Sequence, residues 1–144
     1  MTYLDVVNTI KNFFEDSPLI ERVVNEDLDG FDLNKAKIYP LALFYVNSVN
    51  LAPPINTFTI NILVMDLLDV NNETDEDNKD FIWNQSLAVI NNFVSRLNRG
   101  DLFSEQVQIT GEVLAEPFTD RFDNGLAGMG ISVQINVPNS MTIC

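Results

Sequence analysis

The chain of 144 residues contains no histidine, and its single cysteine is the last residue, Cys144. Histidine is the commonest general base and a frequent zinc ligand, so a Ser-His-Asp triad and a histidine zinc centre are excluded within this chain. One cysteine can form neither an intrachain disulfide nor a cysteine metal cluster, which fits a reducing compartment. We therefore predict a protein with no metal site and no cofactor.

Positive charge is also scarce. Eight Lys and Arg residues stand against 21 Asp and Glu residues, which gives a formal net charge of -13. No window of the sequence gathers the cations into a basic patch. Because phosphate backbones and anionic membrane surfaces would repel such a chain, we expect neither direct nucleic-acid binding nor a membrane partner.

Long apolar runs are missing as well. No segment approaches the roughly 18 apolar residues of a membrane span, and the start of the sequence lacks a charged region followed by an apolar one. We expect the protein to stay inside a cell, or inside an assembly built there. The hydrophobic content of 46% excludes a disordered chain, and the length fits a single domain over residues 1–144.

Two helices are predicted. The first covers residues 2–16, with Thr2 as its cap, Asp5 near its positive end and Pro18 beyond it. The second covers about residues 75–98, where Thr74 with Asp77 resembles a capping box and Gly100 is a stop signal. Its apolar residues recur at spacings of four, three, four and three, which predicts one face packed on a sheet: Trp83, Leu87, Ile90, Val94 and Leu97.

Alternation of apolar and polar residues predicts strands at about 40–50, 56–68, 106–115 and 128–137. Residues 19–25 fit an edge strand or an extended arm. The predicted fold class is α+β: a mixed, mainly antiparallel sheet of four to five strands, with two helices packed on one face and a long C-terminal hairpin.

The segment from Ala115 to Gly128 predicts this hairpin. Pro117 cannot donate to a strand ladder, and Asn124-Gly125 readily adopts positive φ, so the chain turns over here. Phe118, Arg121 and Phe122 are costly to leave in water. They pack either under the loop or against another chain, so the candidate interface residues are Phe118, Arg121, Phe122 and Asn124.

Two groups of acidic residues are candidates for chemical sites. Residues 69–80 place oxygen ligands at loop positions of a calcium-binding EF-hand, but Thr74 replaces the required glycine and Asp80 replaces the final glutamate. A second group could form a pair for glycoside hydrolysis, although nothing in the spacing fixes a separation: Glu112, Glu116, Asp120 and Asp123. We predict that neither is a site and that the chain has no catalytic residues.

The order of these elements resembles a known family. Tyr39-Pro40 leads into a strand, a long strand ends at Val64-Met65-Asp66-Leu67-Leu68-Asp69, and an acidic break, a helix and a strand precede the segment Ala115–Gly128. Over roughly residues 35 to 138, this arrangement is similar to small structural proteins of tailed bacteriophages, of the tail-terminator or tail-completion kind.

The resemblance implies a non-enzymatic virion protein that forms a closed ring at the neck or at the head-proximal end of the tail. It implies about six or twelve copies in that ring, with portal, adaptor and tail proteins as further partners. DNA would pass through the ring without specific binding, and the protein would reach the virion after assembly in the bacterial cytoplasm.

Two alternatives stay open from the sequence. One is an adaptor ring attached to the portal of a short-tailed phage, which would differ in its neighbours and copy number. The other is a monomeric cytoplasmic domain that uses the acidic loop for a metal or a basic partner.

Overall fold

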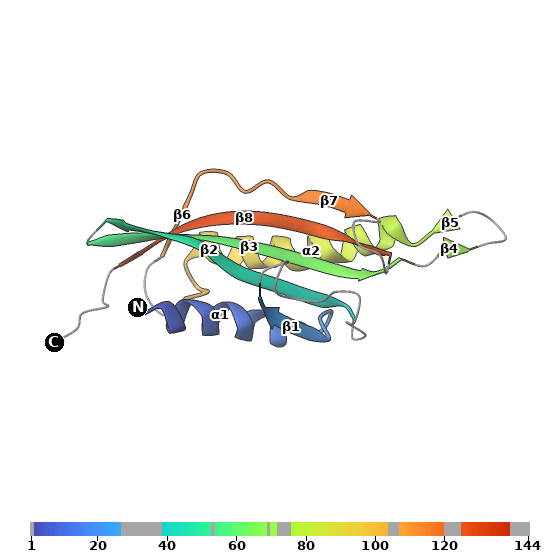
Figure 1. The fold of residues 1–144 in the computed structure, drawn as a ribbon, viewed down its shortest axis with the longest axis horizontal. Coiled ribbons are helices and arrows are strands. Elements are labelled where there is room, and N and C mark those ends of the chain that lie inside the picture. The colour runs from blue at the N-terminus through green and yellow to red at the C-terminus, as the bar shows by residue number, and fades with distance from the viewer. Residues whose placement is uncertain are drawn as a thin grey trace.

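The computed structural model describes residues 2–26, 39–52, 54–68, 70–71, 76–103, 107–119 and 125–138. Its main sheet has six strands in the order β1-β2-β3-β8-β6, and β7 also pairs with β8 (Figure 1). The elements are α1 (Tyr3–Glu15), β1 (Arg22–Asn25), β2 (Leu41–Ala52), β3 (Ile55–Leu67), α2 (Lys79–Arg99), β6 (Gln108–Thr110), β7 (Glu116–Thr119) and β8 (Leu126–Pro138). A separate ribbon joins β4 (Val70–Asn71) to β5 (Glu76–Asp77).

The predicted fold class is confirmed, with more strands than the four to five expected. Only β1 runs parallel to its neighbour β2, and the other pairs are antiparallel. The segment predicted as an edge strand or an arm therefore contains a true edge strand.

The start of α1 agrees with the predicted cap. The backbone N–H of Asp5 donates to the Thr2 hydroxyl at 3.2 Å, and the N–H of Thr2 donates to the Asp5 carboxylate at 2.8 Å. The hydrogen bond from the Thr2 N–H holds the pKa of Asp5 below its ordinary value, because it favours the charged carboxylate. Two otherwise unpaired donors are satisfied, which fixes where the helix begins.

The end of α2 agrees with the sequence, but its start does not. Gly100 caps the helix with φ of 77°, and its N–H donates to the carbonyl of Leu97. The helix begins at Lys79 instead of near residue 75, because Glu76 and Asp77 pair with β4 as a strand. The cap residue is Asn78, whose side chain makes no capping hydrogen bond, so the predicted capping box at Thr74 and Asp77 does not start the helix.

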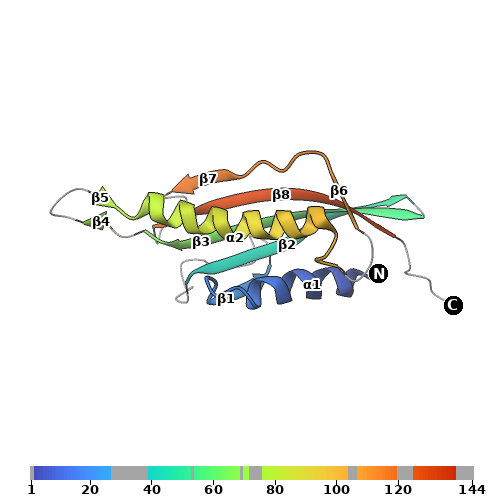
Figure 2. The same ribbon diagram turned by 180° about the vertical axis from the view of Figure 1, so that it is seen from behind.

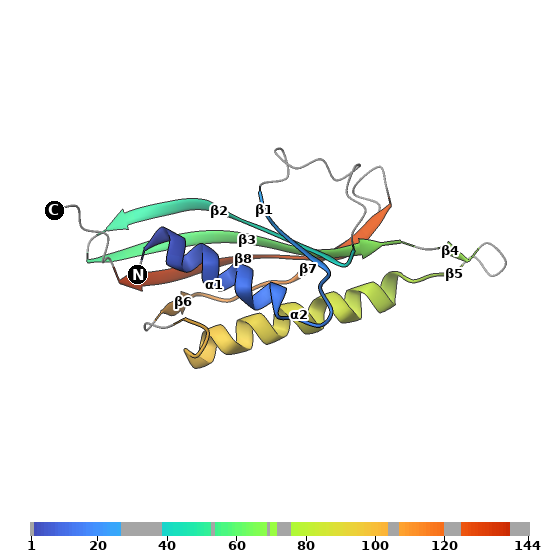
Figure 3. The same ribbon diagram turned by 90° about the horizontal axis from the view of Figure 1, so that it is seen from below.

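Both helices cover the same side of the main sheet (Figures 2 and 3). Phe13 and Phe14 of α1 meet Phe93 of α2 with ring centroids 5.3 and 5.5 Å apart. The inward side chains of the three long strands complete this core, among them Phe44, Phe58, Ile60, Ile62, Met129, Ile131, Val133 and Ile135.

The predicted buried face of α2 is wrong by part of a turn. Leu87 is 44% exposed, whereas the buried residues are Ile82, Ser86, Val89, Ile90, Phe93 and Leu97. Trp83 and Val94 lie partly buried at the border of the core. The helix packs on the sheet as expected, but through a face that contains Ser86 and Phe93.

The predicted strand over residues 106–115 is also corrected. Its ladder covers only β6, since Gly111 follows with φ of 73° and the chain leaves the sheet until Glu116. The chain then returns as β7, which pairs with β8 from Glu116 opposite Gly130 to Thr119 opposite Ala127. The C-terminal hairpin is thus present, and Pro117 lies in an edge strand, where its missing donor is tolerated.

Candidate interaction surface

The face of the sheet opposite the helices, called the open face below, changes character along the strands. At one end its side chains form a second buried apolar cluster, made of Val24, Leu41, Leu43, Leu63, Met65 and Leu126. Tyr45 and Phe118 border this cluster and are half-buried. The apolar end therefore belongs to the interior of the fold.

The other end of the open face is polar. Paired positions on β2, β3, β8 and β6 place two rows of side chains across four strands. One row is Asn50, Thr57, Asn136 and Gln108, and the next is Ser48, Thr59, Gln134 and Thr110. We call these eight residues the polar sheet face.

Hydrogen bonds within the open face confirm which way its side chains point. The Thr57 hydroxyl donates to the Asn136 side-chain oxygen at 2.8 Å, between neighbouring strands. Closer to the apolar end, the Asn61 amide donates to the Tyr45 hydroxyl at 2.9 Å. The amides and hydroxyls are thus partly satisfied by each other, and the rest remain free to meet water or a partner.

Charge is excluded from this part of the molecule. The sequence has no charged residue from Ile38 to Met65, and none from Asn124 to its end. β2 and β8 therefore carry no charge, and β3 carries only Asp66. In a chain with a net charge of -13, the long strands form the surface on which like-charge repulsion is weakest.

The hairpin formed by Val46–Asn61, called the projecting hairpin below, extends past the helices (Figure 1). Near its tip, Leu51 is 74% exposed and Ile55 is 47% exposed. Asn47 is an extra residue on β2, because the register shifts between Val46 and Ser48. Two exposed apolar side chains at the end of an uncharged hairpin make this tip a candidate contact site.

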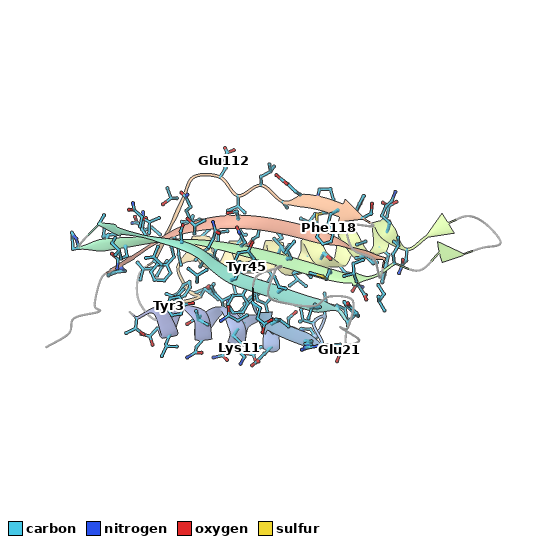
Figure 4. The ribbon with its side chains drawn as sticks, in the orientation of Figure 1. Tyr3, Lys11, Glu21, Tyr45, Glu112 and Phe118 are labelled. Carbon is cyan, nitrogen blue, oxygen red and sulfur yellow. The ribbon has the colours of Figure 1, made fainter. Side chains whose placement is uncertain are left out.

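A groove of about 370 Å³ lies between the sheet and the connection from β6 to β7. Tyr45, Asn61 and Leu63 line its floor, and Glu112, Leu114 and Glu116 line its rim. Figure 4 shows Glu112 pointing away from the molecule at this connection. Glu112 and Glu116, two of the four carboxylates weighed for glycoside hydrolysis, thus border one groove, while Asp120 and Asp123 lie outside the described residues.

Of the four predicted interface residues, the structure describes Phe118. Its ring packs against the second cluster, and its carbonyl accepts a hydrogen bond from Trp83 Nε1 at 3.0 Å. This bond ties β7 to α2. Arg121, Phe122 and Asn124 lie outside the described residues, as does Thr74.

The acidic loop is described only at 70–71 and 76–80. Among the described residues, no three Asp, Glu or Cys side chains gather where they could hold a metal ion. Asp66, at the end of β3, is half-buried, and this desolvation raises the pKa of its carboxyl above the ordinary value.

The sequence contains a signal for the projecting hairpin that is not a motif. This signal is an absence of charged residues. In a chain of which 20% is charged, 28 consecutive residues from Ile38 to Met65 carry no charge. The exposed tip residues Leu51 and Ile55 flank Pro53-Pro54, which reads as a simple break until the two strands around it are seen to pair.

No protein-family model matches the chain, and a search of curated proteins finds no match. In the described residues, no helix is both long enough and apolar enough to cross a membrane.

Proposed function

We propose that the chain is a non-enzymatic structural protein of a tailed bacteriophage virion, which forms a closed homo-oligomeric ring at the neck or at the head-proximal end of the tail. The observation that carries the proposal is the projecting hairpin, which is uncharged and ends in exposed Leu51 and Ile55 within a chain of net charge -13. The family resemblance of the sequence supplies the place in the virion.

Charge decides which surface can join copies of this chain. Copies that carry a charge of -13 repel one another at neutral pH, and each carboxylate buried between them would need a compensating partner. The projecting hairpin and the polar sheet face contain no carboxylate. They therefore offer contact without that cost.

The polar sheet face alone is too small for a stable interface, so a second contact surface is needed. Four strands about 4.8 Å apart, each spanning about three residues of roughly 3.3 Å, cover roughly 200 Å². A stable specific interface buries about 800 Å² on each partner. The exposed tip and the groove beside β7 provide additional, different surfaces, and a ring needs two different patches that fit each other.

The test is the mass of the purified protein under native conditions over a range of concentrations, together with electron microscopy of the same sample. We expect one closed species with an open centre. A protein that stays monomeric at every concentration, and with added tail or portal partners, would contradict the ring.

A matched pair of substitutions tests the role of the hairpin. Leu51→Glu puts a charge on the tip, whereas Leu4→Glu makes the same change at another exposed leucine, in the first turn of α1. We expect both variants to keep the circular dichroism spectrum of the native chain, and only Leu51→Glu to lose the ring. Equal behaviour of the two variants would mean that the contact lies elsewhere.

Phe118→Ala tests the interface role predicted for the C-terminal hairpin. If Phe118 serves mainly the second cluster, this variant loses stability as a monomer. If it serves an interface, the monomer stays stable and assembly is lost. Arg121→Glu gives the corresponding test by charge reversal.

A further inference from the structure

The two outermost strands at the polar end of the sheet are open on their outer sides. In the described part of the chain, β1 accompanies β2 only as far as Phe44, so Val46–Ala52 has a strand on one side alone. On the opposite edge, β6 pairs with β8 and is the last strand in the order. Rows that start at Asn50 and Ser48 end at Gln108 and Thr110, so both open edges lie at the same end of the sheet.

Neither open edge carries a charged side chain or a proline. Natural proteins guard edge strands with charged side chains, proline, bulges or very short strands. β7 follows this practice, because it contains Pro117 and Glu116. Val46–Ala52 contains no charge and no proline and carries one bulge at Asn47, and Gln108–Thr110, although short, has no charge either.

The strand directions suit a continuation of the sheet from one copy to the next. Each step from β2 to β3, β8 and β6 is antiparallel, so β6 runs opposite to β2. If β6 of one copy lies beside β2 of the next, the alternation continues unbroken. The new pair is then antiparallel, which is the more favourable ladder.

The side chains also suit this junction. The two rows of the polar sheet face would continue from Gln108 and Thr110 of one copy to Asn50 and Ser48 of the next, and all four side chains are exposed. Amides and hydroxyls on neighbouring strands form cross-strand hydrogen bonds, as Thr57 and Asn136 already do at 2.8 Å. The complementary edge of a second copy can therefore occupy each open edge without placing a carboxylate in the two rows.

We infer that Val46–Ala52 pairs in antiparallel fashion with Gln108–Thr110 of the neighbouring copy, so that a single sheet runs through the assembly. This inference rests on the proposed ring and names the contact that builds it. The contact joins two different edges, so it is heterologous, and a repeated heterologous contact closes into a ring when its rotation allows.

Disulfide trapping tests this pairing. In a Cys144→Ser background we combine Asn50→Cys with Gln108→Cys, and separately Asn50→Cys with Thr110→Cys, which covers two registers of the same face. Within one copy the two edges are three strand spacings apart, about 14 Å. A disulfide needs Cα atoms within about 7 Å, so every bond formed on mild oxidation joins two copies.

We expect at least one double variant to give a ladder of linked multimers on a denaturing gel, which returns to monomer on reduction. The control is Asn50→Cys with Glu116→Cys, which moves the second cysteine to the protected edge at β7 and should give no ladder. Single variants carry one thiol each and should stay monomeric. Linked dimers of the single Asn50→Cys variant would instead show that two copies pair β2 with β2, and would overturn the inference.

Native mass of each variant separates this inference from the proposed function. A ring that yields no disulfide in either double variant rejects the edge pairing and leaves the ring standing. A monomer at all concentrations, without disulfides, rejects both. Circular dichroism checks that the variants are folded, and the positions that receive a cysteine, Asn50, Gln108, Thr110 and Glu116, are all exposed.

Discussion

The two faces of the main sheet differ in how far they are apolar. On the side covered by helices, Phe58, Ile60, Ile62 and Val64 are all buried, so β3 is apolar on this face over most of its length. On the open face, β3 passes from buried Met65 and Leu63 to half-buried Asn61, Thr59 and Thr57. The open face thus changes from interior to surface between Leu63 and Asn61.

This difference separates the parts of the sheet that hold the fold together from the part that is available for assembly. Burial of apolar side chains contributes most of the stabilisation, so the covered face and the apolar end of the open face should tolerate substitution poorly. The polar end should tolerate it well in the monomer. Four predictions test this ranking, from the largest expected effect to the smallest.

The largest effect is expected for Phe93→Ala on the covered face. Phe93 is 1% exposed and contacts the rings of Phe13 and Phe14. Removing a buried phenylalanine costs about 3–5 kcal/mol, which is a large part of the free energy of unfolding of a domain. Urea unfolding followed by circular dichroism measures it.

The control for this prediction is Leu87→Ala on the same helix. Because Leu87 is 44% exposed, its truncation should change the free energy of unfolding by no more than about 0.5 kcal/mol. Equal losses in the two variants would mean that α2 presents a different face to the sheet.

The second largest effect is expected for Gly128→Ala at the apolar end of the open face. A Cβ atom here would overlap the backbone carbonyl of Val64 and lie 3.0 Å from the Phe118 ring. Overpacking of this kind costs about 1–3 kcal/mol. The melting temperature should fall accordingly.

Gly130→Ala is the matched control for Gly128→Ala. Its Cβ atom would lie 3.0 Å from the Leu63 side-chain end, which can move, and 3.8 Å from the nearest backbone oxygen. The melting temperature of Gly130→Ala should therefore fall less than that of Gly128→Ala. A larger loss for Gly130→Ala would contradict the close approach of β3 and β8 at Gly128.

A smaller effect is expected where the open face becomes polar. Asn61→Ala and Tyr45→Phe each remove the hydrogen bond between these two side chains, which contributes about 0.5–1.5 kcal/mol in typical cases. The double variant should lose less than the sum of the two single losses, since there is one bond to remove. Additive losses would show that the two groups do not interact in solution.

The smallest effect is expected for Asp66→Asn. Because burial raises the pKa of Asp66 in the folded chain, the folded state binds its proton more tightly than the unfolded state does. Ionisation therefore destabilises the fold as the pH rises through the unfolded and then the folded pKa. The variant should melt slightly higher than the native chain at about pH 7, and the difference should vanish near pH 3.

Leu67→Ala is a neighbouring variant that keeps the Asp66 carboxylate and serves as the comparison for Asp66→Asn. Its difference from the native chain should not depend on pH, because it leaves the titrating group in place. If Asp66→Asn still melted higher than the native chain by the same amount at low pH, ionisation of the Asp66 carboxyl would not be the cause of the difference.

The sequence predicted the elements whose signals are local. The Thr2 cap and the Gly100 stop act within one helical turn, and the structure has both. The fold class also followed, since strand and helix periods differ clearly in this chain. These features depend on neighbours in the sequence, so no knowledge of tertiary contacts was needed.

The predictions from the sequence were wrong where contacts between distant residues determine which face is buried and where a strand ends. α2 has apolar residues on more than one side, and the predicted stripe through Leu87 fits the spacing as well as the true one, which includes buried Ser86. The strand expected over 106–115 is shortened to 108–110, because Gly111 turns the chain away from the sheet and pairing with β8 resumes only at Glu116. The sequence predicted the candidate surface least well. Only the pairing of β2, β3, β8 and β6 brings the residues of this surface into rows.

The hydrogen bond from Trp83 to the Phe118 carbonyl gives the protein an internal optical probe. Trp83 is the single tryptophan of the chain, so its fluorescence reports on one place, the junction of α2 with β7. If β7 loosens from the sheet, the indole N–H exchanges a carbonyl for water and the emission shifts to longer wavelength. The emission wavelength of Trp83 can therefore report whether β7 stays attached during assembly, without a label. It does not report on the opposite edge of the sheet at β2.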